Sequence, residues 1–138
     1  MTKIIKEFEL QRKTGKNSSL AKGNEMISAN DRLNPIVKSK ITKHLRELAY
    51  QMSEPLAEPF SPDKPCKVDV IVFAPTRRRM DAPNWYPTVK ALIDGMTDAD
   101  ILTDDNNHII KKMSFAYGGL SGTKKYKLKI IITELEKK

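Results

Sequence analysis

The chain has 138 residues, and its 25 Lys and Arg outnumber its 17 Asp and Glu to give a formal net charge of +8. This length suits one compact domain, and we expect residues 1–138 to form a single unit. A lone cysteine excludes an internal disulfide, no apolar run reaches the roughly 18 residues that span a bilayer, and the charged N-terminus lacks a signal-peptide core. We therefore expect a soluble cytoplasmic protein without a membrane role. The basic excess favours a polyanionic partner such as nucleic acid, although basic charge also serves solubility alone.

The first third of the chain predicts a strand, a loop and a helix. Residues 3–10 alternate apolar and charged side chains, which is typical of a strand. Residues 13–25, rich in Gly, Ser, Asn and Lys, have almost nothing to bury and predict a mobile basic loop. Asn34 and Pro35 then resemble a helix N-cap and a first-turn proline, and apolar residues recur every three or four positions until about Ser53. Four prolines between residues 55 and 65 predict the loop that follows.

The remaining elements alternate between strands and a second helix. Residues 67–73 are β-branched and alternating, so they predict the clearest strand. Residues 87–96 carry an apolar stripe at helical spacing after a first-turn proline. Two strands are expected at residues 108–117 and 124–135, separated by a turn at Gly118 and Gly119. The order β-α-β-α-β-β predicts an α/β or α+β domain with a mixed sheet and two main helices.

Carboxylates cluster between residues 77 and 105 of this otherwise basic protein. An arginine triplet (Arg77, Arg78 and Arg79) leads into Asp81, and five further aspartates follow, namely Asp94, Asp98, Asp100, Asp104 and Asp105. One reason to mass carboxylates is a hard divalent cation, which takes oxygen ligands and bridges a protein to phosphate. The arginine triplet would hold a phosphate backbone that carboxylates alone repel. Lys90 and Asp94 are four residues apart and therefore share one face of the second helix.

Each of these features also has an ordinary structural interpretation. Lys90 with Asp94 is a common surface ion pair, and Asp98 and Asp100 suit a helix end or turn. Asp81 suits a turn before the second helix, and the stretch from residue 104 to residue 107 suits a solvated turn. The combination of basic triplet, spaced carboxylates and lysine is what favours a phosphate-directed metal site.

This combination resembles the signature of the RusA family of Holliday-junction resolvases. In that family a basic run, an Asp, an Asn, a Lys, an Asp on the same helix and a paired Asp-Asp follow one another. The matching residues here are Arg77, Arg78, Arg79, Asp81, Asn84, Lys90, Asp94, Asp104 and Asp105. Residues 90–105 match in register, residues 28–42 resemble RusA-like proteins of phages and prophages, and Gly118, Gly119 and the final strand resemble the family's last hairpin.

The chain departs from the better-known members of the family in one place. They carry Asp-x-Asp-Asn, whereas this sequence has DAPN at residues 81–84 and lacks the second aspartate. The spacing to Lys90 is also longer, by about three residues, a pattern shared with the phage-type branch. The missing ligand could be replaced by Asn84, by Asp104 or by Asp69.

The resemblance implies a homodimeric endodeoxyribonuclease that resolves four-way DNA in recombination and repair, with Mg²⁺ or alternatively Mn²⁺ as cofactor. It implies Asp81 and Asp105 as metal ligands together with Asp104 or Asn84, Asp94 as a ligand or orienting acid, and Lys90 at the attacked phosphate. It also places such a protein in the cytoplasm of a bacterial cell, encoded by a phage or prophage. We expect the DNA contacts to come from Arg77, Arg78, Arg79, Lys90, Lys111 and Lys112.

Several alternatives remain open at this point. Trp85 and Tyr86 either stack on unpaired bases or pack in the core, and His108 is either a general base or the start of a strand. The protein as a whole could instead be a non-catalytic nucleic-acid-binding module, or a less selective nuclease that cuts flaps and forks.

Overall fold

The computed structural model describes residues 1–12, 24–32 and 34–136, so most of the loop expected at residues 13–25 lies outside the described residues. Its elements in chain order are β1 (Lys3–Leu10), α1 (Pro35–Met52), β2 (Cys66–Ala74), the 3₁₀ helix η2 (Ala82–Trp85), α2 (Tyr86–Asp98), β3 (Ile110–Leu120) and β4 (Tyr126–Glu134). The predicted order β-α-β-α-β-β and the single α+β domain are thus confirmed. Neither described helix combines the length and apolarity that crossing a membrane requires.

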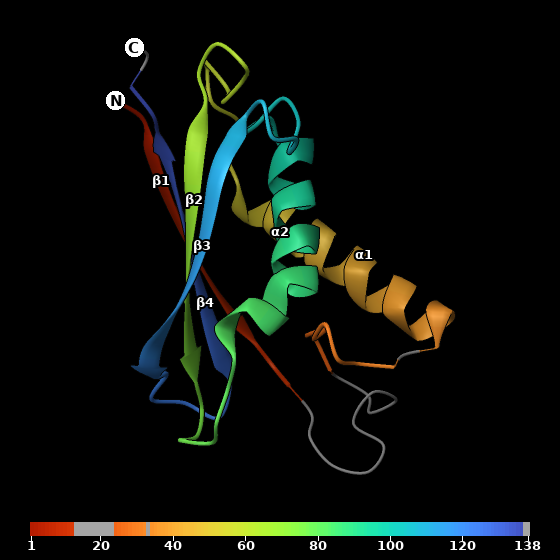
Figure 1. Ribbon diagram of the computed structural model, residues 1–138. Helices are drawn as coiled ribbons and strands as arrows, with labels where there is room; N and C mark the ends of the chain where they lie inside the picture. Colours follow the sequence, from red (N-terminus) through yellow and green to blue (C-terminus); the bar gives the residue numbers. More distant parts are fainter. Residues whose placement is uncertain (13–23, 33, 137–138) are drawn as a thin grey trace.

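The sheet is mixed, with strand order β1-β4-β2-β3. β2 and β3 pair in parallel, whereas β4 pairs antiparallel with both β2 and β1. Parallel neighbours require a crossover, which the η2–α2 unit supplies between β2 and β3 (Figure 1). The last strand added by the chain therefore lies in the middle of the sheet, and β3 becomes an edge strand.

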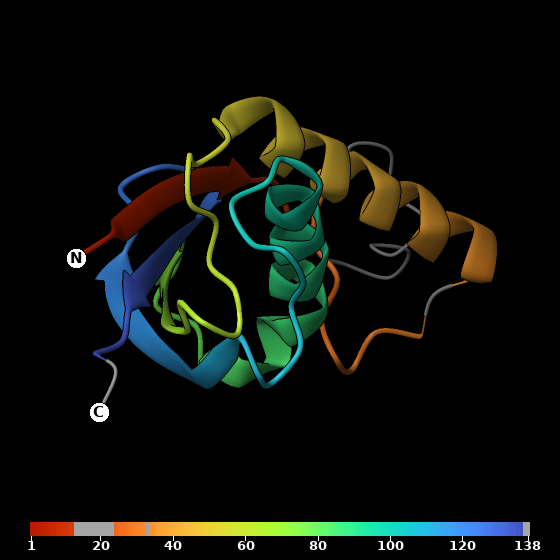
Figure 2. The same ribbon diagram turned by 90° about the horizontal axis from the view of Figure 1, so that it is seen from above.

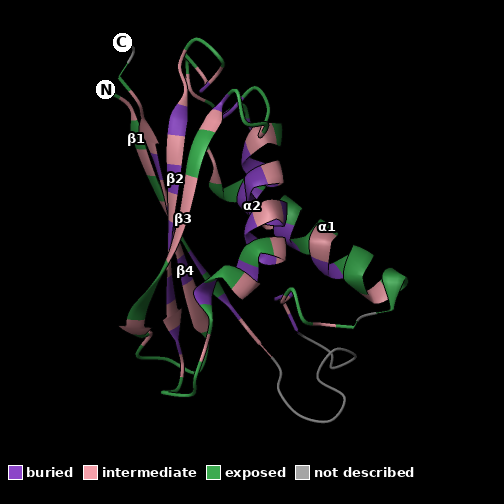
Figure 3. Cartoon of the chain, viewed as in Figure 1, coloured by how far each residue is buried: buried purple, intermediate pink, exposed green. Residues whose placement is uncertain are grey.

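Both helices lie on one face of the sheet, as the two orthogonal views show (Figures 1 and 2). Along β2 the side chains of Val68, Val70 and Val72 are buried toward the helices, while the residues between them are only half-buried. The same alternation occurs along β4 and the end of β1, so the purple residues of Figure 3 gather between the sheet and α2. The period of two in the strands is what fixes this single core.

The helices α1 and α2 cross at a glycine. The side chain of Asn34 caps α1 by accepting a hydrogen bond from the Ile36 N–H at 2.8 Å. A Cβ atom placed on Gly95 of α2 would lie only 2.2 Å from the carbonyl oxygen of Arg46 and 2.8 Å from the Cβ of Ala49 on α1. The close crossing is thus possible only because residue 95 has no side chain.

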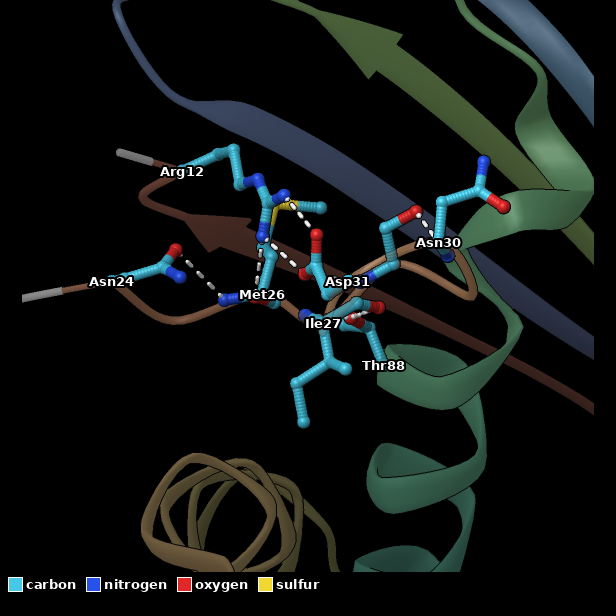
Figure 4. Close-up of polar contacts among 8 residues, drawn as sticks. Arg12, Asn24, Met26, Ile27, Asn30, Asp31 and Thr88 are labelled. Atoms are coloured by element: carbon cyan, nitrogen blue, oxygen red, sulfur yellow. Dashed lines mark hydrogen bonds and ion pairs between the residues drawn. The ribbon is translucent and has the colours of Figure 1, made fainter. Parts of the chain in front are cut away.

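The segment that enters α1 is clamped over the start of α2 (Figure 4). The Arg12 guanidinium donates two hydrogen bonds to the carboxylate of Asp31, at 2.7 and 2.6 Å, and a third to the carbonyl of Met26. The buried Thr88 hydroxyl donates to the carbonyl of Ile27 and accepts from its N–H, both at 2.8 Å. Burial raises the pKa of Asp31, but the hydrogen bonds and charge of Arg12 outweigh it and leave that pKa below the usual value.

Two details of the final strands differ from the sequence-based prediction. The turn expected at Gly118 and Gly119 is wrong, because β3 continues to Leu120 and the turn is centred near Gly122, which has a φ of 78°. A Cβ atom on Gly118 would lie 2.6 Å from side-chain atoms of both Ile71 and Phe73, so this glycine serves close packing within the strand. The expected last hairpin is also wrong, since β4 pairs with β1 and β2 and is separated from β3 by β2.

We predict that Gly95→Ala destabilises the protein by about 1–3 kcal/mol, because the new methyl group forces α1 away from α2. The intrinsic preference of helices for Ala over Gly would change the stability in the opposite direction, by about 1 kcal/mol. Urea unfolding followed by circular dichroism measures the difference, with the exposed α1 position Ser39→Ala as the control. A Gly95→Ala protein as stable as the wild type would contradict the close helix crossing.

We also predict that Asp31→Asn lowers the free energy of unfolding near neutral pH by about 1.5–3 kcal/mol, since the charged hydrogen bonds to Arg12 are lost. A carboxyl group whose folded pKa is lowered stabilises the fold above its unfolded pKa, and that contribution disappears as the pH falls through the folded value. The gap between wild type and variant should therefore close below pH 3.8. Asp100→Asn, at an exposed turn residue, serves as the control, and a gap independent of pH would refute the assignment.

Candidate active site

The outer side of α2 carries a lysine and an aspartate that meet. Val89, Leu92, Ile93 and Met96 are buried in the core, which leaves Lys90 and Asp94 together on another face of the helix. The Lys90 Nζ donates a hydrogen bond to Asp94 Oδ1 at 2.7 Å. This is the spacing of four residues that the sequence indicated, and by itself it is an ordinary helical ion pair.

The loop between α2 and β3, residues 99–109, brings a second carboxylate to the same lysine. Ile101, Leu102 and Ile109 are buried and anchor this loop, and Leu102 forms a parallel bridge with Phe60. The loop therefore folds back along α2, and Asp105 Oδ2 accepts a hydrogen bond from the Nζ of Lys90. We call Lys90, Asp94 and Asp105 the Lys90 cluster.

Asp104 stabilises the conformation of this loop from the side. Its Oδ1 accepts the backbone N–H of Asp105 at 2.7 Å, and its Oδ2 accepts the side-chain amide of Asn106 at 3.3 Å. The side-chain oxygen of Asn106 in turn accepts the N–H of His108 at 2.9 Å. Asn106 thus forms an Asx turn with His108, and Asp104 presents Asp105 with both of its carboxylate oxygens occupied by these bonds.

The charges in the Lys90 cluster stabilise one another. Partial burial lowers the pKa of Lys90, but the hydrogen bonds to Asp105 and Asp94 and their charges outweigh it and raise that pKa to about 12. The hydrogen bond from Lys90 is the main reason why the pKa of Asp105 lies below its usual value. The lysine is therefore cationic and Asp105 anionic over the whole physiological range of pH.

A second ion pair lies beside the cluster and was not anticipated from the sequence. Arg46 of α1 donates two hydrogen bonds to the carboxylate of Asp98 at the end of α2, at 2.5 and 2.8 Å. The bonds to Asp98 are the main cause of a raised Arg46 pKa, and the charges of Asp94 and Asp105 add to it. These partners are 52 residues apart in the chain, so no local pattern indicates the pair.

Asp81 and Asn84 lie at a different place from the Lys90 cluster. Asp81 precedes η2 at the amino end of the η2–α2 unit, and both residues line a pocket of about 290 Å³ with Ser28, Arg79, Met80, Trp85 and Tyr126. Among the described residues, the exposed Asp81 carboxylate has no hydrogen-bond or ion-pair partner. The structure thus brings together Lys90, Asp94 and Asp105, with Asp104 adjacent, and leaves Asp81 and Asn84 in this separate pocket.

The other candidate residues are distributed as follows. The arginine triplet is exposed in the loop after β2, and Lys111 and Lys112 are exposed near the start of β3. The Asp69 carboxylate accepts a hydrogen bond from the Ser114 hydroxyl at 2.6 Å on the face of the sheet away from the helices. His108 is exposed and lies just before β3, which begins at Ile110 rather than at residue 108.

Trp85 packs in the core and is not available for stacking on a base. It is only 6% exposed, the Arg12 guanidinium lies 5.3 Å from its ring centroid, and its ring meets that of Tyr126 in a T-shaped contact with centroids 5.1 Å apart. Tyr86, the next residue, is 46% exposed. The stacking role considered for both aromatics is therefore open to Tyr86 alone.

The donor set of the Lys90 cluster fits one mode of Mg²⁺ binding. The described residues contain no group of three or more His, Cys, Asp or Glu side chains arranged to hold a metal ion. However, oxygens of Asp94 and Asp105 converge on one cation, the ammonium group of Lys90. Mg²⁺ commonly binds through one or two carboxylates plus the phosphates of its substrate. The cluster suits that substrate-completed mode and not a closed protein cage.

Comparison with models of protein families and with curated protein sequences finds no match to this chain.

Proposed function

We propose that this chain is a metal-dependent endonuclease that cuts branched DNA, with four-way junctions as its substrate and Mg²⁺, or alternatively Mn²⁺, as its cofactor. The observation that carries the proposal is that the α2–β3 loop folds back to bring Asp105 to Lys90 and Asp94. This joins two sequence segments of the RusA-like signature in space. Exposed basic residues of the same signature, the arginine triplet, lie in the loop that leads into η2 and α2.

In this proposal Lys90 acts on the scissile phosphate. Its raised pKa of about 12 keeps the ammonium charged at neutral pH, and its side chain remains partly exposed. A phosphate oxygen can replace a carboxylate as its partner, and the fixed positive charge then stabilises the negative charge that develops during hydrolysis. Lys90 is thus both the resting partner of the carboxylates and the group that recognises phosphate.

The two carboxylates of the cluster would hold the metal ion, with Asp81 as the further ligand that the resemblance implies. Asp105 remains anionic because of its lowered pKa, and Asp94 lies next to it on the same lysine. The chemistry such an ion supplies when bound is Lewis-acid polarisation of the phosphodiester and activation of water. Asp104 positions Asp105 through the backbone N–H bond, so its contribution would be to orientation.

The resemblance of residues 77–105 to the RusA signature also implies an oligomeric state and a cellular location. A homodimer would carry two such sites, and two-fold symmetry suits the paired incisions that resolve a four-way junction. The arginine triplet with Lys111 and Lys112 would contact the DNA backbone, since all five side chains are exposed. The setting implied is the cytoplasm of a bacterial cell, with the gene carried by a phage or prophage.

Two other functions make different predictions. A non-catalytic DNA-binding module would use the same basic residues and would leave the aspartates as turn and surface groups. The meeting of Asp105 with Lys90 and Asp94 favours the nuclease, because a simple turn does not need a loop anchored by buried residues to deliver a carboxylate to a helix. A less selective flap or fork nuclease shares the chemistry and differs only in the DNA that it cuts.

We predict that the purified protein nicks a synthetic four-way junction only when Mg²⁺ or Mn²⁺ is added. Asp105→Asn and Lys90→Ala should each lower the nicking rate at least about 100-fold, as expected when a group that stabilises the transition state is removed. Junction affinity, measured without metal by gel shift, should change little for Asp105→Asn. Asp100→Asn is the matched control, because its exposed side chain lies outside the cluster.

The outcomes separate the three functions. Nicking that persists in the Asp105→Asn protein would remove the Lys90 cluster from the active site. Tight junction binding without nicking under any metal condition would establish the binding module instead. Equal rates on junction, flap and linear duplex DNA would leave a nuclease but overturn its selectivity.

The role of Asp81 is tested separately. The resemblance makes it a metal ligand, whereas the structure places it in the pocket beside Asn84 and Trp85. We predict that Asp81→Asn abolishes nicking as completely as Asp105→Asn and leaves junction binding in place. Circular dichroism should show an unchanged fold, since the Asp81 carboxylate makes no hydrogen bond among the described residues. Full activity of this variant would confine the catalytic groups to the Lys90 cluster.

A further inference from the structure

Two exposed tyrosines and a half-buried phenylalanine form a row of aromatic side chains along the edge of the sheet beside the start of α2. Tyr86 is 46% exposed, and its ring makes a T-shaped contact with that of Phe115, with centroids 6.4 Å apart and planes at 67°. Tyr117, two residues farther along β3, is 53% exposed. We call Tyr86, Phe115 and Tyr117 the aromatic row.

The register of the sheet places the row on the helix-bearing face. Phe115 pairs with Val70 and Tyr117 with Val72, and both valines are buried toward the helices. Side chains two residues apart on a strand share a face, so Phe115 and Tyr117 follow one another along the same side of β3. Figure 3 shows that this end of β3 is largely exposed, whereas the neighbouring part of β2 alternates between buried and half-buried residues.

The fold itself does not account for this exposure. Trp85, one residue before Tyr86, is buried and completes the core at this end of the molecule. β3 is an edge strand with no neighbour on its outer side among the described residues, so nothing in the described chain covers Tyr117. Tyr86 and Tyr117 flank the half-buried Phe115, and a contiguous apolar patch of this kind commonly marks a binding surface.

The arginine triplet brings positive charge to one end of the row. Ala74 at the end of β2 pairs with Leu120 of β3, so the loop with the arginine triplet leaves the sheet at the same end as Tyr117. On α2, Lys90 lies four residues after Tyr86 and therefore on the same helix face, about 6 Å along the axis. A ligand on the row would thus lie between the arginine triplet and the Lys90 cluster.

We propose that the aromatic row binds unpaired nucleobases of a DNA strand by stacking. The proposal rests on the proposed function in taking DNA as the substrate, and it adds how the branch is recognised. Aromatic faces stack on any base, and neighbouring cations bind the phosphates of the same strand. Bases opened at a branch point would stack on Tyr117 and Tyr86. The backbone of the same strand would then run along α2 to Lys90.

The charge distribution favours this occupant over two others. A second copy of the chain docked antiparallel along this edge would bring its arginine triplet toward Lys111 and Lys112 of the first, and like charges oppose such contact. A protein partner would have to supply acidic groups on both sides of an apolar anchor, whereas a nucleic acid strand combines π surfaces with regularly spaced negative charge.

The test measures binding of fluorescein-labelled 12-nucleotide oligothymidylate and of a blunt duplex of equal length by anisotropy, in EDTA so that no cutting occurs. Tyr117→Ser and Tyr86→Ser should each weaken binding to the single strand about 5- to 100-fold, the range for loss of one stacked base. Duplex binding should stay within about two-fold, because paired bases do not stack on side chains. Tyr117→Phe should retain wild-type affinity, since the π face is kept.

The matched control is Tyr50→Ser on α1, where a tyrosine is 54% exposed but far from β3 in sequence and element. Equal single-strand affinity of Tyr117→Ser, Tyr86→Ser and wild type would overturn the inference while leaving junction nicking, and hence the proposed function, intact. Equal loss of single-strand and duplex binding together with a change in sedimentation would also overturn it, by identifying the row as a subunit contact. If the proposed function is wrong, the wild-type protein does not nick the junction, whatever these binding measurements show.

Discussion

The parallel pairing of β2 with β3 is the constraint on which the candidate site depends. Parallel neighbours cannot be joined by a tight turn, so the chain must cross the sheet through η2 and α2 before it enters β3. This crossover lays α2 alongside the edge strand and leaves a loop at each end of the helix. One loop carries the arginine triplet, and the other carries Asp105 back to Lys90. The positions of the candidate functional groups therefore follow from the topology of one βαβ unit, while α1, β1 and β4 support it.

The helix α2 packs against the sheet and α1 on one side, against the segment around Ile27 at its first turn, and exposes its remaining face. Its buried side packs on β2 and crosses α1 at Gly95, and its first turn is held by Thr88 against the segment around Ile27. These contacts fix the rotation of the helix, which directs Tyr86, Lys90 and Asp94 outward in one line. A helix held less firmly could not keep Lys90 between two carboxylates. The contacts that stabilise the core are thus the same contacts that orient the side chains of the candidate site.

The sequence predicted what is local and missed what is not. The alternation of β2 and the helical stripe of α2 correspond to real elements, and the Lys90–Asp94 pair follows from a spacing of four. The pairing of β4 with β1 and β2 joins residues far apart in the chain, so the expected hairpin was wrong. The turn expected at Gly118 was wrong because β3 continues to Leu120. Asp105 reaches Lys90 because buried residues anchor the 11-residue loop 99–109 against the core. No local sequence pattern predicts the path of this loop. The Arg46–Asp98 pair joins two helices and was likewise out of reach.

If the protein acts on phosphate as proposed, the charge of the Lys90 cluster gives carboxylates a role in an otherwise basic protein. One lysine against Asp94 and Asp105 leaves the cluster with net negative charge, so by itself it repels a phosphodiester. In the proposed function Asp94 and Asp105 would hold a divalent cation, whose charge would reverse that sign and allow a phosphate to bind. Metal and substrate would consequently bind together, each stabilising the other, with Lys90 moving from carboxylate to phosphate. The arginine triplet, outside the negative cluster, can hold the DNA backbone before this exchange takes place.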